Sequence, residues 1–502
     1  MPWRSAPTGG ASASARKSGA GASASRQARN SMAGVLAAVD LGAATGRVFA
    51  GAVTGQRLDL KPVARFPNVP IAIAGGLHWN ATELWAGILA GLSAAAADSA
   101  DGIASVGIDS WGADYALLVG GRLLGVPFQY RDGRGERGAE SVHARIDRRS
   151  LYKRNGLESL PFNSLYQLAV DASDGMTAIA ETLAFMPDLY GYWLTGRVAT
   201  EPTIASTSGL LDARSRSWDT DLADLLGIGS RLLPELLEPG SELGAVLPGI
   251  GAAPGMRRTI VRKVASHDTA SAVVGTPMES EAAAYLSCGT WALLGVEVDW
   301  PVLDQRAEAA GFTNEAGVDG RILLQKNLMG LALVNGVIAE SHNESLEQVL
   351  RVAADVRLDK SALIDPADPA FLRPGSVVSA IRSALSARGV HSPLTAPELV
   401  RCVVDSLAAA FTRAIEELEG ITGRQIRTLH IVGGGARNEL LCQLTADRAE
   451  RMVLAGPVEA SVVGNLLVQA RAAGEVTGDL AAMRAIVRKS FDVRAFEPRA
   501  RH

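Results

Sequence analysis

The sequence predicts an α/β protein that contains a duplicated unit. Residues 35–40 form a short apolar run, which a glycine-containing turn joins to a second apolar run at 48–53. The same strand–turn–strand pattern returns at residues 282–298, in the second half of the chain. Helical patterns lie between the strands, and this alternation is typical of the α/β class.

The individual elements follow from local patterns. A third strand is expected at residues 58–66, and residues 83–97 carry leucine and isoleucine at helical spacing. A longer apolar stripe at 399–418 predicts a second helix, and Thr395 with Glu398 three residues later predicts a capping box at its start. The chain has 502 residues, which is enough for two large domains.

Composition restricts the classes of function. Hydrophobic residues make up 47% and charged residues 20% of the chain, and the net charge is −4. This balance gives no electrostatic case for binding nucleic acid or an anionic membrane. No apolar run reaches the roughly 18 residues that a membrane span needs. Cys288, Cys402 and Cys442 are odd in number and widely spaced, which indicates a reduced, cytoplasmic protein without a cysteine metal site.

Residues 1–34 differ from the rest of the chain. They are mostly alanine, serine and glycine, with five basic residues and no acid. Because such a segment has little apolar surface to bury, we expect a disordered tail. The expected tail is compatible with a true start of the chain near Met32, and an organelle transit peptide is the alternative, since the segment is basic and free of acids.

The first glycine-containing turn, Asp40 to Arg47, predicts a phosphate-binding hairpin. Small residues let backbone N–H groups approach phosphate oxygens closely. Thr45 and Arg47 add a hydroxyl and a cation, and Asp40 ends the strand where it could hold Mg²⁺ through water. The turn Ser287 to Thr290 is its counterpart in the second half. Both turns could equally be ordinary connections between strands.

A third glycine-rich turn, Gly433 to Gly435, follows a strand expected at 429–432 and precedes a helix that Asn438 can cap. A turn of this kind lets a flat base or a ribose lie against the backbone. The pattern is not GxGxxG, so a dinucleotide fingerprint is absent. A plain strand-to-helix connection remains the alternative.

Asp268 is the candidate general base. It precedes a helix-like segment that runs to residue 274, and a carboxylate there can accept the proton of a hydroxyl that attacks a γ-phosphate. The alternative is that Asp268 serves only as a helix N-cap. His267 is expected to hydrogen-bond a sugar, or else to be a structural histidine. Residues 107–115 end a strand with two carboxylates, a tryptophan and a tyrosine, a set that fits either sugar binding or capping and packing.

Taken together, these motifs resemble the FGGY family of carbohydrate kinases, within the sugar kinase, Hsp70 and actin superfamily. The resemblance runs from about Val35 to Arg494, which is essentially the whole chain except the tail. The matching stretches are AVDLGAATGRV (38–48), HW (78–79), GIDSWGADYALL (107–118), YRDGR (130–134), MPDLYGYWLTG (186–196), SHDTASAV (266–273), YLSCGTWALLG (285–295), KNLMGL (326–331), VGGGARNELLCQLTAD (432–447) and AGPVEASVVGN (455–465).

The resemblance implies two ribonuclease-H-like domains around a central cleft. Residues 35–276 would form an N-terminal domain that binds sugar and phosphate, and residues 277–494 a C-terminal domain that binds ATP, with a short tail at 495–502. The implied activity is transfer of the γ-phosphate of ATP, with Mg²⁺, to the 1-hydroxyl of a ketose. L-Rhamnulose is the first expected substrate, and L-fuculose and xylulose are the alternatives.

The resemblance also assigns roles by position. Asp268 would be the base and Asp40 the carboxylate associated with Mg²⁺. The implied sugar contacts are Gly112, His267, Asp268, Thr269 and Asn327. The implied nucleotide contacts are Ala43, Ala44, Thr45, Gly46, Arg47, Thr290, Asn335 and Gly435. Asn335 stands where a glutamine is expected, and Cys442 stands alone where the best-known members carry a close cysteine pair.

Other classes are less favoured. A glycerol kinase should carry an Arg-Glu pair before its substrate aromatic residue, and this chain has none. A non-catalytic regulator on the same fold usually carries a helix-turn-helix, for which residues 1–34 are too rich in small residues. An Hsp70-like ATPase needs a peptide-binding domain, for which no length remains. The expected partners are therefore a sugar and ATP, with no nucleic acid or membrane, in a monomer or homodimer.

Overall fold

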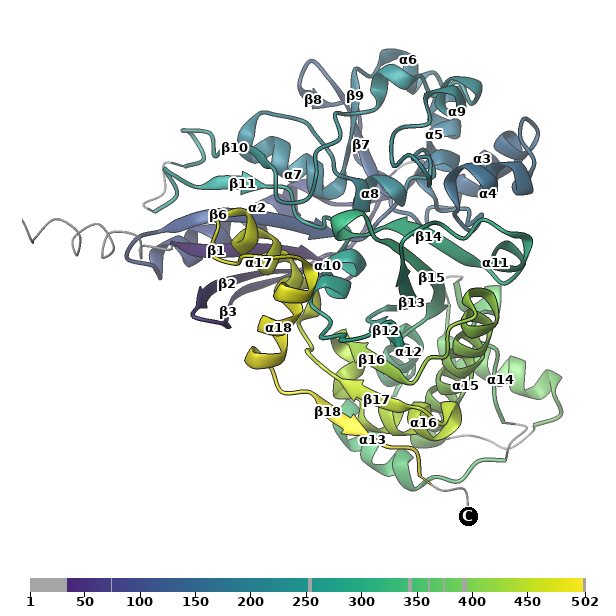
Figure 1. The fold of residues 1–502 in the computed structure, drawn as a ribbon. Coiled ribbons are helices and arrows are strands. Elements are labelled where there is room, and N and C mark those ends of the chain that lie inside the picture. Colours follow the sequence, from purple (N-terminus) through teal and green to yellow (C-terminus); the bar gives the residue numbers. More distant parts are fainter. Residues whose placement is uncertain are drawn as a thin grey trace, which may run out of the picture. The chain divides into compact units, whose positions relative to one another are not determined.

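The computed structural model describes residues 34–73, 75–251, 255–341, 345–359, 362–372, 375–390 and 395–499. The tail expected at residues 1–34 therefore lies outside the described residues, apart from Gly34. Two large mixed sheets dominate the described part, and helices flank both of them (Figure 1).

The first sheet has six strands in the order β10-β11-β6-β1-β2-β3. Strand β1 pairs antiparallel with β2 and parallel with β6, and β6 pairs parallel with β11. The strands are β1 (Val35–Leu41), β2 (Thr45–Thr54), β3 (Arg57–Pro67), β6 (Ile103–Ser110), β10 (Glu242–Ala245) and β11 (Ile260–Arg262). Helix α2 (Ala81–Ala97) connects the β1–β3 hairpins to β6 and buries the leucine and isoleucine stripe that the sequence predicted.

The second sheet has seven strands in the order β14-β15-β13-β12-β16-β17-β18. Strand β12 pairs antiparallel with β13 and parallel with β16, and β16 pairs parallel with β17. The strands are β12 (Ala283–Cys288), β13 (Trp291–Val298), β14 (Phe312–Ala316), β15 (Ile322–Met329), β16 (Thr428–Val432), β17 (Met452–Ala455) and β18 (Arg494–Phe496).

The two sheets share one topology. The order β11-β6-β1-β2-β3 in the first corresponds to β17-β16-β12-β13-β15 in the second, with the same strand directions at each position. Helix α15 (Ala396–Thr422) then takes the place that α2 has in the first half. The predicted α/β class and the predicted duplication are confirmed.

The halves differ in one connection, which runs from β6 to β11 in the first half and from β16 to β17 in the second. Between β16 and β17 the chain forms only a 3₁₀ turn, η4 (Gly433–Arg437), and α16 (Glu439–Ala449). Between β6 and β11 it forms a large insertion that includes most of the helices of the first half. Its elements are β7 (Tyr115–Val119), β8 (Arg122–Leu123), α3 (Arg134–His143), α4 (Arg148–Asn155), α5 (Ser164–Ser173), α6 (Met176–Ile179), β9 (Thr182–Phe185), α7 (Met186–Thr195), α8 (Pro202–Ser206), α9 (Thr220–Leu225), η1 (Ser230–Leu232) and β10.

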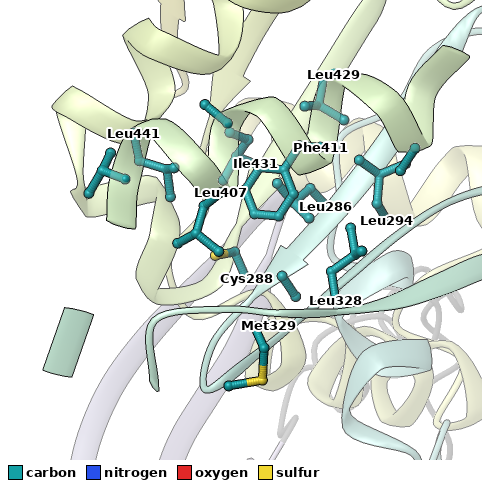
Figure 2. Close-up of a cluster of buried hydrophobic side chains, with 14 of the residues drawn as sticks. Leu286, Cys288, Leu294, Leu328, Met329, Leu407, Phe411, Leu429, Ile431 and Leu441 are labelled. Atoms are coloured by element: carbon teal, nitrogen blue, oxygen red, sulfur yellow. The ribbon is translucent and has the colours of Figure 1, made fainter. Parts of the chain in front are cut away.

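The core of the second half lies between its sheet and helices α15 and α16. Figure 2 shows Leu407 and Phe411 of α15 beside Leu286 and Ile431 of the sheet. The predicted capping box is present, since the Thr395 backbone N–H donates to Glu398 Oε2 at 2.7 Å. The remaining elements are α11 (Gln305–Ala309), η2 (Val318–Gly320), α12 (Ala332–Glu340), α13 (Leu346–Asp355), η3 (Pro369–Leu372) and α14 (Val377–Ala387), with β4 (Ile71–Ile73) and β5 (Gly76–His78) forming a hairpin in the first half.

Two helices near the C-terminus return to the first sheet. Helix α17 (Ala460–Ala472) packs on β1 and β6, and α18 (Leu480–Ser490) packs on β3 (Figure 1). Asn465 Nδ2 donates to the buried carboxylate of Asp109 at 2.5 Å, and Gln469 Nε2 donates to the Ala37 carbonyl at 3.0 Å. The border proposed between residues 276 and 277 lies between α10 (Asp268–Val274) and β12, but the core of the first half also needs α17.

Helices α10 and α17 cross at small residues. A Cβ atom at Gly464 would lie 1.9 Å from the Ser271 carbonyl oxygen, and one at Gly275 would lie 2.2 Å from the Ala460 carbonyl oxygen. Both helices begin where a strand of corresponding position ends, α10 after β11 and α17 after β17. The glycines therefore allow helices α10 and α17 to lie close together.

Two further features concern the whole described chain. None of its described helices has the length and apolar character needed to cross a bilayer. The three cysteines are free and buried. Burial raises the pKa of the Cys402 thiol to about 11 and that of the Cys288 and Cys442 thiols to about 12, so all three are protonated at neutral pH.

Candidate active site

A cavity of about 1020 Å³ is lined by residues of both sheet-bearing halves. It brings together most of the predicted site residues, although they come from distant parts of the sequence. Those that line it are Asp40, Ala43, Ala44, Thr45, Arg47, Gly112, His267, Asp268, Thr269, Thr290, Asn327 and Asn335. Gly46 and Gly435 are not part of the lining. A Cβ at Gly46 would lie 2.1 Å from the Phe66 ring and one at Gly435 would lie 2.6 Å from Cys288, so packing requires a glycine at both positions.

The β1–β2 turn is fixed at the edge of this cavity. The Gly42 N–H donates to the Thr45 carbonyl at 2.9 Å, which closes the turn. The buried side chain of Asn68 holds it from behind, since Nδ2 donates to the Gly42 carbonyl at 2.9 Å and the Ala44 carbonyl accepts from the Asn68 N–H at 3.0 Å. Ala43 and Ala44 face the cavity without a bulky side chain, which suits close approach of an anion to the backbone.

Arg47 is the centre of a charged cluster that the sequence only partly predicted. Its guanidinium makes ion pairs with Asp40 of β1 and with Glu459 at the start of α17. Ser461 Oγ also donates to Asp40 Oδ2 at 2.9 Å. Glu459 and Ser461 line the cavity, but no role was predicted for either. The signal was available, since both belong to the stretch AGPVEASVVGN on which the family resemblance depends.

The second hairpin turn faces the same cavity from the other half. The Thr290 backbone carbonyl accepts from the Ala332 N–H at 3.3 Å, so the turn is tied to the start of α12, the helix that carries Asn335. Gly433 and Gly434 both line the cavity, and Gly433 has a φ of 76°. A Cβ at Gly433 would lie 3.0 Å from the Cys288 carbonyl oxygen, so strand β12 also needs a glycine there.

Asp268 is the first residue of α10 and lies in the cavity with 32% of its side chain exposed. The N-cap of α10 is His267, so the alternative that Asp268 is an N-cap is wrong. Burial raises the pKa of Asp268 to about 6, against the opposing effect of His267 and with a further rise from Asp40. A carboxylate with such a pKa is ionised at neutral pH and well matched to accept a proton there.

His267 lies between two carboxylates. Its Nδ1 is 2.9 Å from Glu315 Oε2 on β14, and its Nε2 is 3.5 Å from Asp268 Oδ1. Burial lowers the pKa of His267, but Glu315 outweighs this effect and, with Asp268 and Glu201, raises it to about 9. The imidazole is therefore positively charged at neutral pH. Glu315 was not predicted from the sequence.

The strand end at residues 107–115 divides between the two readings left open above. Trp111 and Gly112 line the cavity. A Cβ atom at Gly112 would lie 2.9 Å from the Thr207 side chain, so a larger residue does not fit there. Asp114 does not line it, because its Oδ2 accepts from Trp79 Nε1 at 2.6 Å and from Trp111 Nε1 at 2.9 Å. Asp114 thus orients the tryptophan that faces the ligand space.

Aromatic rings close one side of the cavity. Tyr130 and Phe162 come from the insertion of the first half and Trp291 from the second hairpin, with ring centroids of Phe162 and Trp291 5.9 Å apart. Trp291 Nε1 donates to the Tyr130 hydroxyl at 3.4 Å. Asn163 lies beside them, and its buried Oδ1 has no hydrogen-bond partner among the described residues. Apolar faces with an unpaired acceptor fit the C–H groups and hydroxyls of a sugar.

Asp40 is the residue at which the sequence predicts a metal ion. The described residues contain no group of three or more side chains suited to hold a metal ion by themselves. Asp40 is a buried carboxylate at the edge of the phosphate-type hairpin. Mg²⁺ commonly binds through one or two carboxylates, water and substrate phosphates, so this single acid fits a nucleotide-bound Mg²⁺.

Comparison with known families identifies the chain. Residues 35–275 match the model for the FGGY family of carbohydrate kinases, N-terminal domain, and residues 284–473 match the model for its C-terminal domain. The chain therefore belongs to the FGGY family of carbohydrate kinases and is an ATP-dependent carbohydrate kinase.

Curated relatives agree with this assignment over most of the length. The chain is 42% identical over 451 residues to a rhamnulokinase of Pectobacterium carotovorum, with 89% of each chain covered. It is 37% identical over 444 residues to a rhamnulokinase of Bacteroides thetaiotaomicron, covering 88% of this chain and 91% of that one.

Solved structures share the fold at lower sequence identity. A ligand-bound xylulose kinase of Lactobacillus acidophilus aligns with a TM-score of 0.76 at 18% identity, covering 93% of this chain and 94% of that one. A glycerol kinase of Plasmodium falciparum with ADP aligns with a TM-score of 0.73 at 15% identity, covering 92% and 94%. The predicted fold, two ribonuclease-H-like domains around a central cleft, is confirmed.

Proposed function

We propose that this kinase transfers the γ-phosphate of ATP to the 1-hydroxyl of L-rhamnulose. The single observation that supports this reaction is the position of Asp268, which lies in one cavity with both hairpin turns. Its pKa of about 6 is close to neutral pH, so it can both take and release a proton there. The sugar is inferred from curated relatives named rhamnulokinase, which share 37–42% identity over about nine-tenths of the chain.

The residues divide the work by charge. Asp268 accepts the proton of the attacking hydroxyl, and His267 holds a positive charge beside it. Arg47 and the backbone N–H groups of residues 43–45 stabilise negative charge on the transferring phosphate. Mg²⁺, associated with Asp40 when nucleotide is bound, would neutralise charge on the β- and γ-phosphates.

The sugar would occupy the part of the cavity between Trp111 and the start of α10. Gly112, Thr269 and Asn327 are proposed to contact it, and Thr290 and Asn335 are proposed to contact the nucleotide. Gly46 and Gly435 would act through the backbone positions they allow rather than by direct contact. We further propose that the enzyme works in the cytoplasm, as a monomer or a homodimer.

The test is ADP release with Mg-ATP against L-rhamnulose, L-fuculose, L-ribulose, D-xylulose and glycerol. We expect the highest kcat/KM for L-rhamnulose and loss of turnover in Asp268→Asn. A higher kcat/KM for another ketose would keep the mechanism and overturn the substrate. Full turnover in Asp268→Asn would overturn the mechanism.

A further inference from the structure

The ion pair of His267 and Glu315 connects the two halves of the protein inside the cavity. His267 precedes α10 of the first half, and Glu315 is part of β14 in the second sheet. Their side chains approach to 2.9 Å, and each is only 8% exposed. Neither His267 Nδ1 nor Glu315 Oε2 has a hydrogen-bond partner among the described groups, so the contact between them is an ion pair rather than a well-aligned hydrogen bond. The pair is therefore each partner's main compensation for burial.

The far side of the imidazole faces the candidate base. His267 Nε2 lies 3.5 Å from Asp268 Oδ1, so the ring stands between the carboxylates of Glu315 and Asp268. Its backbone is also fixed, because the His267 N–H donates to Thr203 Oγ1 at 3.2 Å. The ring cannot turn away without breaking this arrangement.

Other charges near these groups do not replace Glu315. Glu201, at the start of α8, also acts on His267, but its carboxylate already accepts the N–H groups of Thr203, Ile204 and Ser266. Two further groups act on Asp268 or respond to it, Asp40 of β1 and Asp109 of β6, and both are acids. Glu315 is thus the carboxylate that is placed and available to keep the imidazole charged.

We propose that Glu315 is a positioning residue for phosphoryl transfer, which holds His267 as an imidazolium and thereby keeps Asp268 ionised as the base. This inference rests on the proposed role of Asp268. A buried histidine without a carboxylate partner tends to be neutral. A neutral ring would remove the cation beside Asp268, and the acid would then hold its proton at a higher pH. Because Glu315 belongs to the second half, Asp268 is kept ionised only when the two halves are in contact.

A matched control separates this role from a general contribution to contact between the halves. Glu308 of α11 pairs with Arg149 of α4 at 2.8 Å and so also joins the two halves. Neither residue lines the cavity. Glu308→Gln removes an ion pair of the same kind without changing the charges around His267.

The first experiment compares the pH dependence of kcat/KM for the sugar in wild type, Glu315→Gln and Glu308→Gln. Wild type should lose activity as the pH falls through about 6, as Asp268 takes up a proton. In Glu315→Gln this acid limb should move to higher pH, because a neutral imidazole no longer stabilises the carboxylate. Glu308→Gln should keep the acid limb of wild type. An unchanged acid limb in Glu315→Gln would overturn the proposal.

A second measurement does not depend on turnover. The ring signal of His267, assigned by its loss in His267→Asn, gives the imidazole pKa by NMR in the resting enzyme. Glu315→Gln should lower it by about 2 units, while Glu315→Asp, which keeps a carboxylate, should restore most of the shift. An equal pKa in wild type and Glu315→Gln would overturn the proposal. A wild-type enzyme with the expected imidazole pKa but no turnover on any sugar would instead overturn the proposed function.

Discussion

The two halves of this kinase share a strand order, yet corresponding positions carry different chemistry. The first hairpin turn is flanked by a charged pair, Asp40 opposite Arg47. The second turn lies between Cys288, which is fully buried, and Trp291, which belongs to the aromatic wall. Duplication thus provides two similar turns at one cavity, and the side chains make one suited to phosphate and the other to apolar contact.

The helices that follow corresponding strands show the same division. Asp268 begins α10 after β11, and Glu459 precedes α17 after β17. Glu459 is held by Arg47 and also lies 3.4 Å from Arg437, so arginine neutralises its charge. Asp268 has no arginine partner among the described residues, only His267 at 3.5 Å. One acid is therefore left able to take a proton, while its counterpart holds the Arg47 guanidinium in place.

The largest effect should come from removing the unpaired acid. Asp268→Asn should lower kcat by about 10²–10⁴-fold, which is the usual contribution of a positioned general base. Glu459→Gln should change kcat far less and mainly raise the KM for ATP, because it releases Arg47. Steady-state kinetics of both variants, with circular dichroism as a check of folding, tests the division. Equal losses of kcat would contradict it.

The next largest effect should distinguish the two hairpin turns by their contribution to kcat/KM for ATP. Arg47→Ala removes the cation at the first turn and should lower kcat/KM for ATP by about 10–100-fold, the range expected for a hydrogen bond to a charged group. Thr290→Ala at the second turn removes only a hydroxyl, and we expect a loss of a few-fold. Initial rates at varied ATP and saturating sugar give both values. A larger loss in Thr290→Ala would reverse the assignment of phosphate binding to the first turn.

The proton affinity of Asp268 predicts a smaller, pH-dependent effect. Its pKa is raised to about 6, and the reaction needs the deprotonated form. Activity should therefore fall as the pH drops through about 6, and kcat/KM at pH 5 should be about tenfold below its plateau. A profile that stays flat down to pH 5 would show that another group takes the proton.

The sequence predicted the repeated part of this molecule well. The hairpins, the helix at 81–97, the capped helix α15 and the cap that Asn438 makes by accepting from the Leu441 N–H all depend on short-range patterns. Asp268 and the turn residues 43–45, which line the cavity, could be singled out as candidates because turn chemistry and a charged residue at a helix start are local signals.

What the sequence did not reveal depends on contacts between distant segments. Glu315 is an ordinary acid in a strand until the fold brings it to His267, and Glu459 is an ordinary helix-start acid until it meets Arg47. Asp114 was counted among sugar-binding candidates, but its bonds to Trp79 and Trp111 show an orienting role that only packing could reveal. The return of α17 to the first sheet is likewise a long-range result.

The smallest of the expected effects, and one on stability, should come from the crossing of α10 and α17. Gly464→Ala would place a methyl group 1.9 Å from the Ser271 carbonyl oxygen, so the helices must move apart. We expect the free energy of unfolding to fall by about 1–3 kcal/mol, the usual cost of overpacking. Gly420→Ala in α15 is the control, since its nearest neighbour is the Arg306 guanidinium at 3.4 Å and alanine favours a helix by about 1 kcal/mol. Denaturant unfolding of both variants measures the difference, and equal stabilities would mean that the two halves do not depend on this close crossing.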